Sequence, residues 1–327
     1  MKNFALLLFL LLFMNVAMSS DKQYQNCRFK FEPYLEVCQR LVKRKVSIWY
    51  VNKFLLSFKS TQRDWKSFKL FQPQKIVFHA ANEKRANNAL VKYIPEIVRH
   101  LKRYSKVYQL VEKKYQVNRE IIAAILMKET RLGKIKPSHD AFIVFNTMVR
   151  ELNPETKRSQ RLIKMAKSNL VSIIQYCYEK KRHPNRCFFP SSYAGAVGIP
   201  QFMPQNFKYI ESYRRSIGNL SNMNDAIVSV GRFLQQNARF GLLINWSKIP
   251  TMSKVENDWY DYDFKTKKAS FAYAKSSLTG KQYQCFSCEQ PKLKYLREYI
   301  KKIMIYNHSS NYAVGVMRLA YEAWKQR

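Results

Sequence analysis

Glycine and proline are scarce in this chain, and their scarcity is the strongest constraint on its fold. The 327 residues include 8 glycines, about a third of the roughly 7% share of an average protein, and 11 prolines. A fold with many β-turns needs both residues, because glycine adopts positive φ and proline fixes φ at a value that suits turns. Hydrophobic residues make up 46% of the chain, enough for a sizeable core. The sequence therefore predicts a mainly α fold and excludes disordered and collagen-like chains.

Apolar residues recur at helical spacing along most of the chain. At roughly 100–200 residues per domain, the length allows one large domain or two smaller ones. Residues 250–290 differ, because they are rich in Lys, Ser and Tyr and carry a turn signal at Thr279-Gly280; short strands and an irregular loop both fit that pattern. Asn118 precedes one helical segment and is expected to act as its N-cap. The segments with helical spacing are residues 34–60, 88–116, 119–132, 162–177, 225–236 and 310–325.

The first twenty residues have the features of a secretory signal peptide. Lys2 gives a positive start, residues 4–14 form an apolar run, and Ala17-Met18-Ser19 has the small-x-small pattern of a cleavage site. The run is short for a membrane span, which needs about 20 apolar residues, so an uncleaved anchor is the less favoured alternative. The first cysteine is Cys27, which argues against a lipoprotein. We therefore expect an exported protein, periplasmic or secreted, with no transmembrane span once the signal peptide is removed.

The six cysteines lie in three close pairs. Export to an oxidising compartment favours disulfides, and pairing in sequence order is the simplest of the possible connectivities. The last pair forms a C-x-x-C motif, which elsewhere binds zinc or serves redox chemistry, but the sequence has no second such motif and no nearby histidine pair to support zinc. The expected disulfides join Cys27 to Cys38, Cys177 to Cys187, and Cys285 to Cys288.

The chain is strongly basic, with 58 Lys and Arg against 22 Asp and Glu and a formal charge of +36. Such a charge attracts polyanions, either nucleic acid or the anionic polymers and lipids of a bacterial envelope. The basic residues are spread along the whole chain, so most are expected on solvated helix faces. Export favours envelope polymers and lipids as partners over a specific nucleic acid.

Glu129 is the candidate catalytic residue, on the helix expected over residues 119–132. It continues an apolar stripe that starts at Ile122 with i, i+3, i+4, i+7 spacing, close to the C-terminal end of the helix. Apolar surroundings desolvate a carboxylate, and the helix dipole adds negative potential at this end. Both effects are expected to raise the pKa of Glu129 and to favour a protonated general acid. An ordinary ion pair with Lys128 or Arg131 is the structural alternative.

A second segment, in the middle of the chain, combines glycines with neutral hydrogen-bonding residues. Gly195 and Gly198, together with Gly133, are three of the eight glycines. A chain with so few is expected to place them where the backbone approaches another group closely or adopts positive φ. Ser192 and Gln201 flank that backbone, which suits recognition of an uncharged polar ligand such as a sugar. A tight structural turn is the alternative.

A third segment lies at the entry of the last predicted helix. Tyr306, Asn307 and Tyr312 in this segment are suitable for lining a groove. A plain N-cap at Asn307 or Ser309 is the alternative.

Together the three segments resemble the B-type lytic murein transglycosylases of the bacterial envelope. Their order and spacing fit that family, and the likeness covers roughly residues 105–250 and 295–325. The motifs that carry it are Glu129-Thr130-Arg131-x-Gly133, then Ser192-Tyr193-Ala194-Gly195-Ala196-Val197-Gly198-x-x-Gln201-Phe202-Met203-Pro204, then Tyr306-Asn307-His308-Ser309-x-x-Tyr312-Ala313.

The resemblance implies a lysozyme-like α domain over residues 101–327, with extra N-terminal helices in residues 20–100 and a small irregular or β-containing insertion at 250–290. It implies cleavage of the β-1,4 bond between N-acetylmuramic acid and N-acetylglucosamine of peptidoglycan, leaving a 1,6-anhydro end, without a metal or organic cofactor. By position, Glu129 is the catalytic acid and base. The residues implied to hold the glycan are Ser192, Tyr193, Gln201, Tyr306, Asn307 and Tyr312, with loops shaped by Gly133, Gly195 and Gly198.

A single carboxylate agrees with this chemistry. Ordinary glycosidases use two carboxylates about 5–10 Å apart, whereas the three motif segments contain only Glu129. One carboxylate is sufficient when the attacking group is the sugar's own C6 hydroxyl or acetamido oxygen, because the attack is then intramolecular. A hydrolytic muramidase of the same fold, a non-catalytic wall-binding protein and a polyanion-binding protein are the alternative functions.

Two features depart from the family pattern. Residues 214–222 stand where some members have an acidic calcium loop, and they contain no carboxylate, so no calcium site is expected. Lys128 occupies a position that is usually apolar in the family. Because it is one residue from Glu129 on the same helix, its side chain is expected to point about 100° away from the carboxylate.

Overall fold

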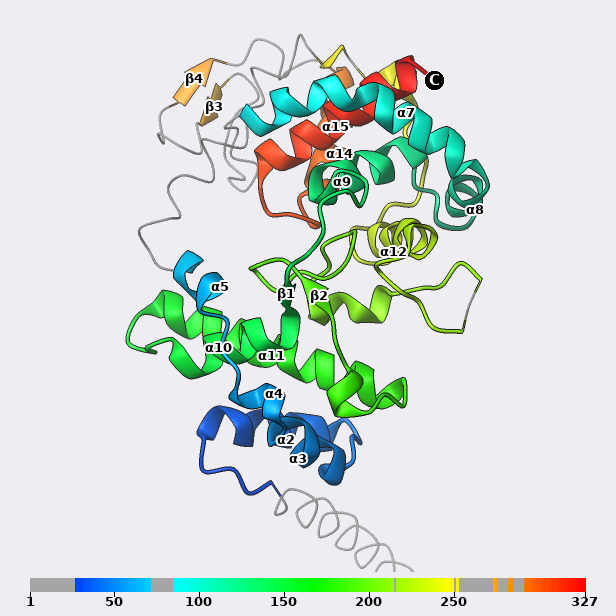
Figure 1. Cartoon of the computed structure of the whole chain (residues 1–327). Helices are drawn as coiled ribbons and strands as arrows, with labels where there is room; N and C mark the ends of the chain where they lie inside the picture. The colour runs from blue at the N-terminus through cyan, green and yellow to red at the C-terminus, as the bar shows by residue number, and fades with distance from the viewer. Residues whose placement is uncertain are drawn as a thin grey trace, which may run out of the picture. The chain divides into compact units, whose positions relative to one another are not determined.

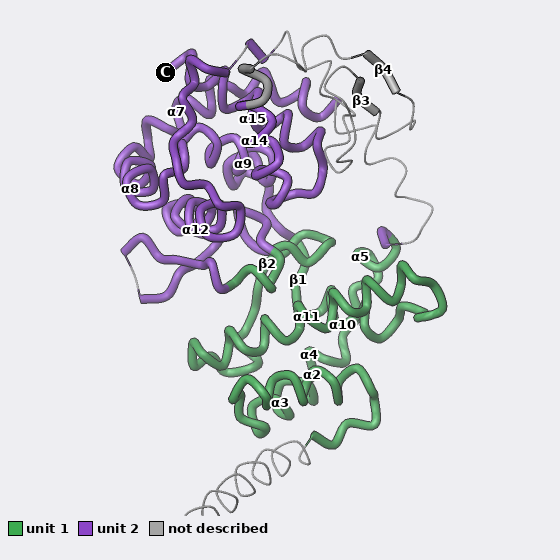
Figure 2. Tube along the Cα trace, turned by 180° about the vertical axis from the view of Figure 1, so that it is seen from behind, with its two compact units in different colours: residues 1–69, 138–196, 203–207 green, residues 70–137, 197–202, 208–327 purple. Residues whose placement is uncertain are grey.

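The computed structural model describes residues 27–71, 85–214, 216–249, 251–252, 273–275, 282–284 and 291–327 (Figure 1). Most of these residues lie in helices, which confirms the predicted mainly α fold. The chain divides into two compact units (Figure 2): unit 1 holds residues 1–69, 138–196 and 203–207, and unit 2 holds the rest. The predicted signal peptide and most of the predicted insertion lie outside the described residues. The predicted division at residues 19 and 100 stays a prediction.

Unit 1 is a group of helices with a short two-stranded sheet. The segment predicted as helical over 34–60 is divided into α2, α3 and α4. The first break, between Lys43 and Ile48, contains Lys45, whose backbone is left-handed at φ 63°. Helix α11 packs against α2, α3 and α10. Strands β1 and β2 are antiparallel, with His139 opposite Ser191. The main elements are α2 (Glu32–Lys43), α3 (Ile48–Leu55), α4 (Phe58–Thr61), α5 (Trp65–Leu70), β1 (His139–Asp140), α10 (Ala141–Glu151), α11 (Lys157–Glu179) and β2 (Pro190–Ser191).

Asn146 of α10 ties three of these helices together. It is fully buried, and its Oδ1 accepts a hydrogen bond from the Tyr34 hydroxyl of α2 at 2.5 Å. Its Nδ2 donates to the carbonyl of Ser60 in α4 at 2.8 Å. An unpaired amide in a core is costly, so these bonds specify how the N-terminal helices meet α10.

Two of the three predicted disulfides form in unit 1. They link α2 to the segment before it, and the end of α11 to the loop before β2. The Cα atoms are 5.9 Å and 6.1 Å apart, normal for disulfides. The third predicted pair, Cys285 and Cys288, lies outside the described residues. The two disulfides are Cys27–Cys38 and Cys177–Cys187.

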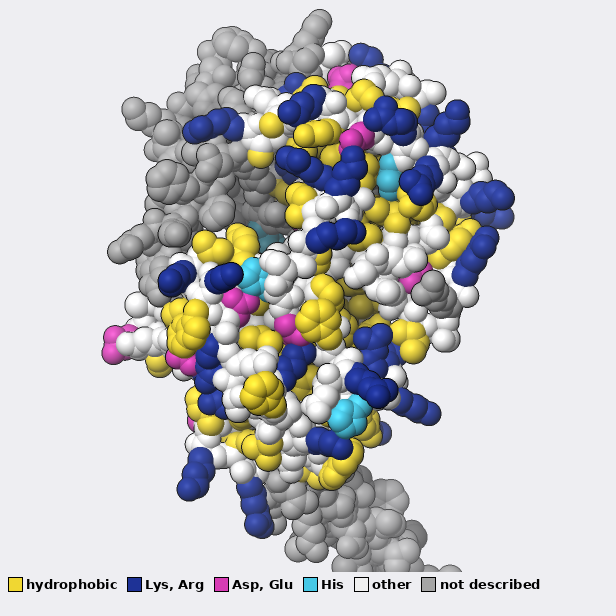
Figure 3. Space-filling model, in the orientation of Figure 1, with side chains coloured by type: hydrophobic (Ala, Val, Ile, Leu, Met, Phe, Trp, Pro, Cys, Tyr) yellow, Lys and Arg dark blue, Asp and Glu magenta, His cyan; other side chains and the backbone are white. Residues whose placement is uncertain are grey.

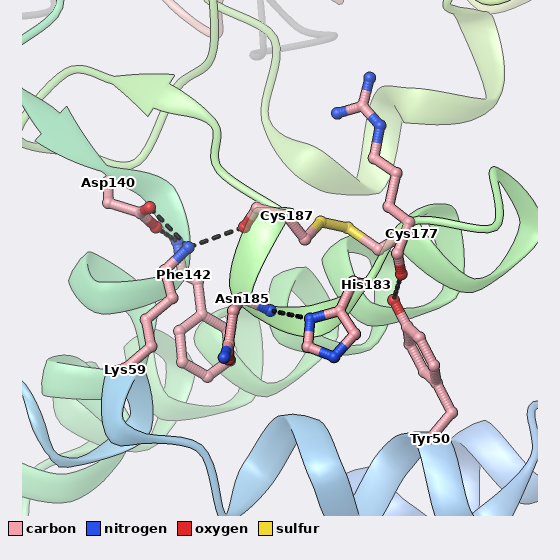
Figure 4. The surroundings of a disulfide bond; sticks show 9 residues. Tyr50, Lys59, Asp140, Phe142, Cys177, His183, Asn185 and Cys187 are labelled. Carbon is pink, nitrogen blue, oxygen red and sulfur yellow. Dashed lines mark hydrogen bonds and ion pairs between the residues drawn. A yellow bond between two sulfur atoms is a disulfide. The ribbon is translucent and has the colours of Figure 1, made fainter.

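The Cys177–Cys187 disulfide lies beside a buried ion pair (Figure 4). Lys59 Nζ donates to the carbonyl of Cys187 at 2.7 Å and lies 2.6 Å from Asp140 Oδ2. Asp140 also caps α10, because its Oδ1 accepts from the amide of Phe142 at 2.8 Å. The ion pair therefore joins α4, the disulfide loop and the start of α10.

Helix α9 (Arg119–Thr130) is the centre of unit 2. It contacts α7, α8, α12 and α15, and residues 121–127 are fully buried. The predicted apolar stripe is thus part of a helix that is packed on several sides. Helix α15 has the bounds expected from the sequence. The other elements are 3-10 helix η2 (Val91–Tyr93), α7 (Ile94–Arg103), α8 (Ser105–Tyr115), α12 (Met223–Gln236), η5 (Trp246–Lys248), α14 (Pro291–Ile303), α15 (Ser310–Lys325) and the antiparallel strands β3 (Tyr273–Lys275) and β4 (Gln282–Gln284). In the described ranges, no helix has the length and apolar character needed to cross a membrane.

Asn118 occupies the N-cap position of α9 as predicted, but its side chain makes no capping hydrogen bond. Its Oδ1 accepts from the amide of Ile244 at 2.6 Å, and its Nδ2 donates to the Ile244 carbonyl at 3.2 Å. Asn118 is buried, and this distant backbone satisfies both ends of its amide, whereas a cap bond would satisfy only the oxygen. The carboxylate of Glu112 instead accepts from the first helical amide, that of Arg119, at 3.0 Å.

His100 of α7 makes the stability of unit 2 sensitive to acid. Burial, together with the charge of Arg103, lowers the pKa of His100 from 6.5 to about 4, and Tyr108 is its hydrogen-bond partner at 3.1 Å. Between pH 6.5 and 4 the unfolded chain therefore binds a proton that the folded chain does not. We expect the unfolding free energy to fall by up to about 3 kcal/mol across that window.

Urea unfolding at several pH values checks this prediction. His100→Gln removes the titration and retains a hydrogen-bonding amide, so its unfolding free energy should decline less between pH 6.5 and 4. Equal pH slopes for the two proteins would contradict the assignment to His100.

Candidate functional site

Glu129 lies in the last turn of α9 and is half-buried. The hydroxyl of Tyr312, from the first turn of α15, donates to Glu129 Oε1 at 2.6 Å. Tyr312 is itself almost fully buried, at 4% exposure. The start of α15 is set by Ser309, whose side-chain oxygen accepts from the Tyr312 amide at 3.2 Å. Two helices that are distant in sequence thus fix the position of one carboxylate oxygen.

Tyr306 stacks on Tyr312 and extends the site. Their rings are nearly parallel, at 4°, with centroids 6.5 Å apart. Phe202 and Phe233 pack around Tyr306 at 6.0 and 5.1 Å. The Tyr306 hydroxyl donates to the carbonyl of Pro200. Burial, and next the charge of Glu129, raise the pKa of Tyr306 well above its ordinary value, so the hydroxyl stays protonated at physiological pH.

Lys128 supports this arrangement from the neighbouring position on α9. Its Nζ donates to Asn87 Oδ1 and lies 4.8 Å from the centre of the Tyr312 ring. Asn87, at 1% exposure, also donates from Nδ2 to the carbonyl of Asn311 at 2.8 Å. Lys128 therefore holds the ring whose hydroxyl contacts Glu129. Nothing in the local sequence around Asn87 marks it as a partner of this site.

The backbone just after Glu129 is unusual. Arg131, Leu132 and Gly133 all have positive φ, at 48°, 57° and 81°. Left-handed backbone is costly for residues with a Cβ and recurs at functional sites. Thr130 stabilises the turn, because its Oγ1 accepts from the Gly133 amide at 3.1 Å and donates to the Ile199 carbonyl at 2.9 Å. Thr130 belongs to the sequence motif, although the motif by itself indicates no role for it.

The predicted middle segment is divided between the two units. Its second half, residues 197–202, belongs to unit 2 and forms a tight turn with Val197 paired to Phe202. Gly198 has φ 71°, and Gln201 has φ 51° and donates from Nε2 to the Gly198 carbonyl at 2.9 Å. The Gln201 amide therefore stabilises its own turn beside the site, in addition to any contact with a ligand.

The first half of that segment, with Ser192, Tyr193 and Gly195, belongs to unit 1. The Ser192 amide donates to the Ala196 carbonyl at 2.9 Å, which closes a loop directly after β2. Gly195 has φ 78°, and a Cβ there would lie 2.4 Å from the ring of Phe145 in α10. Unit 2 thus brings together Glu129, Gln201, Tyr306 and Tyr312, with Asn307 exposed beside them, while Ser192 and Tyr193 are placed by unit 1.

A carboxylate also organises the loop before α12, where some members of the family have a calcium loop. Asp225 of α12 accepts from the amides of Tyr213 at 2.8 Å and Asn219 at 2.9 Å. Within the described ranges, no group of three or more His, Cys, Asp or Glu side chains is arranged to hold a metal ion.

Comparison with solved structures shows the same fold in several lytic transglycosylases. The Escherichia coli lytic transglycosylase Slt35 in complex with bulgecin A is 18% identical, with a TM-score of 0.60 over 91% of this chain and 94% of that chain. Pseudomonas aeruginosa SltB1 is 18% identical, with a TM-score of 0.56 over 89% of this chain and 99% of that chain. Pseudomonas aeruginosa SltB3 in complex with NAG-anhNAM-pentapeptide is 16% identical, with a TM-score of 0.56 over 88% and 77% of the two chains.

These matches confirm the predicted lysozyme-like α fold. Comparison with curated protein sequences finds no significant match. The profile of the family described as transglycosylase SLT domain matches residues 36–321, which is most of the chain, and agrees with the resemblance carried by the three motifs. The chain therefore belongs to the transglycosylase SLT domain family and is a lytic transglycosylase that acts on peptidoglycan.

Proposed function

We propose that this enzyme cleaves the β-1,4 bond between N-acetylmuramic acid and N-acetylglucosamine and leaves a 1,6-anhydro end on the muramic acid. The observation that carries the proposal is the placement of Glu129, the one carboxylate in the three motif segments, against the Tyr312 hydroxyl at 2.6 Å. A site with one acid and several neutral hydrogen-bonding groups suits an uncharged glycan and an intramolecular nucleophile.

Glu129 serves first as acid and then as base. Its proton passes to the bridging oxygen as the bond from C1 to that oxygen breaks. The resulting carboxylate then takes the proton of the C6 hydroxyl, whose oxygen forms the new bond to C1. No water is consumed, and the enzyme ends in its starting protonation state. Tyr312 positions the carboxylate through its hydrogen bond, and the Tyr306 ring stacks on that of Tyr312.

Mass spectrometry of the sugars released from peptidoglycan in ¹⁸O-labelled water tests the reaction. Anhydro ends are one water lighter than hydrolysed ends and carry no label. A hydrolytic muramidase of the same fold would instead give labelled reducing ends. The complex of SltB3 with an anhydro-muramyl peptide supports the first outcome. Labelled reducing ends as the main product would refute the proposed reaction.

Removal of the Tyr312 hydroxyl should slow cleavage without unfolding the protein. Tyr312→Phe keeps the ring against Tyr306 but removes the hydrogen bond to Glu129. That bond is worth about 1.5–3 kcal/mol once Glu129 has become the charged carboxylate that forms as the glycosidic bond breaks. We expect kcat to fall by at least about tenfold. Tyr321→Phe is the matched control, because Tyr321 is a buried tyrosine on the same helix that packs against Trp246 and Trp324. Equal rates for the two variants would remove Tyr312 from the mechanism.

We also propose export to the periplasm and attraction of the basic surface to anionic envelope polymers or lipids. Figure 3 shows Lys and Arg side chains spread over the displayed face, with fewer acidic ones. Binding to intact peptidoglycan sacculi should therefore weaken as salt rises from low to physiological concentration, because counterions screen exposed charges. Salt-independent binding would refute the electrostatic contribution, and a cytoplasmic location in fractionated cells would refute export.

A further inference from the structure

Unit 1 contains a pocket that the proposed reaction does not use. Its volume is about 700 Å³, within the range of roughly 300–1,000 Å³ that is typical of small-ligand sites. The start of α5, strand β1, the first turn of α10 and the loop before β2 supply its lining. All of these residues belong to unit 1, so the pocket is complete within that unit.

Two large aromatic side chains in the pocket lining are exposed. Trp65 is 52% exposed and Phe188 is 56% exposed. Apolar rings gain free energy when a ligand removes them from water. A flat aromatic face beside polar groups contacts the C–H face of a sugar ring while the hydroxyls of that ring reach the polar groups.

The polar part of the lining includes a fixed His–Asp pair. His139 Nδ1 and Asp64 Oδ2 are 2.5 Å apart, and the two side chains are only 17% and 14% exposed. Asp64 is held further, because its Oδ1 accepts from the Ser67 amide at 2.9 Å and its own amide donates to Thr147 Oγ1 at 2.8 Å. Such a pair presents hydrogen-bonding groups to hydroxyls with little loss of conformational freedom on binding.

Several charges near the pocket are paired, whereas Lys66, which also lines the pocket, is exposed. Arg63 Nε lies 2.5 Å from a carboxylate oxygen of Glu151, and Arg63 also donates to backbone carbonyls. Lys59 and Asp140 neutralise each other at 2.6 Å (Figure 4). Because these charges are neutralised within the protein, the pocket can accept a neutral polar ligand.

The pocket is joined to the proposed glycan loop by the small sheet. His139 lies opposite Ser191 in the pairing of β1 with β2, and Ser191 directly precedes Ser192. We propose that the pocket binds an N-acetylhexosamine unit of the glycan strand, away from the bond that is cleaved. Trp65 and Phe188 stack on the sugar ring, and Asp64 and His139 form hydrogen bonds with its hydroxyls. This inference rests on the proposed function, because it takes the same polymer as ligand.

Calorimetric titration of the full-length mature chain tests the pocket. The probe is peptide-free glycan strands, and every protein carries Glu129→Gln so that binding is measured without cleavage. Trp65→Ala removes a stacking face, and Asp64→Asn removes the charge but keeps an oxygen for the Ser67 amide. We expect each to raise Kd by about three- to tenfold. Trp49→Ala is the matched control, because Trp49 is 63% exposed in unit 1 but does not line the pocket.

An unchanged Kd for Trp65→Ala, with melting temperature retained, would overturn the proposal, and so would an equal loss in Trp49→Ala. If Trp65→Ala weakens binding of free stem peptide but not of peptide-free strands, the ligand is the peptide and the proposal is wrong. The masses of the products formed by protein that retains Glu129 show separately whether the reaction gives anhydro or hydrolysed ends. Hydrolysed ends together with a Trp65 effect would refute the reaction only, and anhydro ends with no Trp65 effect would refute the pocket only.

Discussion

Glu129→Gln should reduce peptidoglycan cleavage by at least about a thousandfold while leaving the protein folded. Glutamine cannot deliver a proton to the leaving oxygen and cannot accept one from the C6 hydroxyl, so both steps lose their catalyst; general acid–base groups contribute about 10²–10⁴ each. The fold is expected to persist because Gln has the same shape, Glu129 is half-buried, and the side-chain oxygen still accepts from Tyr312. Release of soluble muropeptides from sacculi measures the loss.

Glu120→Gln provides the control for this experiment. Glu120 is on the same helix, is 1% exposed and pairs with Arg327 at 3.1 Å. Its substitution changes a buried charge on α9 but leaves the last turn of the helix untouched. We expect the specific activity of folded Glu120→Gln protein to remain within about twofold of the parent, even where its stability falls. Substantial activity in Glu129→Gln would refute the role of Glu129 and leave the fold assignment unaffected.

Local patterns predicted the helices that carry the site. Periodic apolar residues placed α9 and α15, and the bounds of α15 agree with the sequence prediction. The motifs also selected Glu129, Tyr306 and Tyr312, which lie together in unit 2. These features can be predicted from the sequence because helical periodicity and motif spacing are properties of short segments.

Contacts between distant segments could not be predicted from local sequence patterns. Asn118 has the residue type of an N-cap, yet its amide pairs with Ile244, 126 positions away. Asn87 joins Lys128 to Asn311 of α15, although these residues lie 41 and 224 positions away from it, and no local pattern identifies it. The division of the glycine segment after residue 196 likewise depends on which unit each half packs against. Buried polar groups form hydrogen bonds with groups that are close in the folded structure, and a single sequence does not reveal which groups those are.

Gly198→Ala should be among the most destabilising substitutions in unit 2. The residue has φ 71°, and a Cβ there would lie 2.4 Å from Leu220 Cβ and 2.7 Å from the Leu220 carbonyl oxygen. The backbone of Leu220 would have to move, although its carbonyl accepts from the Ile199 amide at 2.9 Å. The carbonyl of Ile199 in turn accepts a hydrogen bond from the side chain of Thr130, which directly follows Glu129. We expect a loss of more than about 3 kcal/mol in unfolding free energy and a fall in activity of the remaining folded protein.

A series of three glycine substitutions separates steric overlap from backbone strain. Gly241→Ala meets no atom within 4 Å and should be nearly neutral. Gly133→Ala has φ 81° but its nearest contact is a flexible side chain at 3.3 Å, so it should lose only the cost of left-handed backbone, about 1–2 kcal/mol. Thermal unfolding should therefore rank Gly241→Ala above Gly133→Ala, and Gly133→Ala above Gly198→Ala. Equal losses of unfolding free energy in Gly133→Ala and Gly198→Ala would show that positive φ alone accounts for the requirement for glycine at position 198. The close approach to Leu220 would then not stabilise the turn beside Glu129.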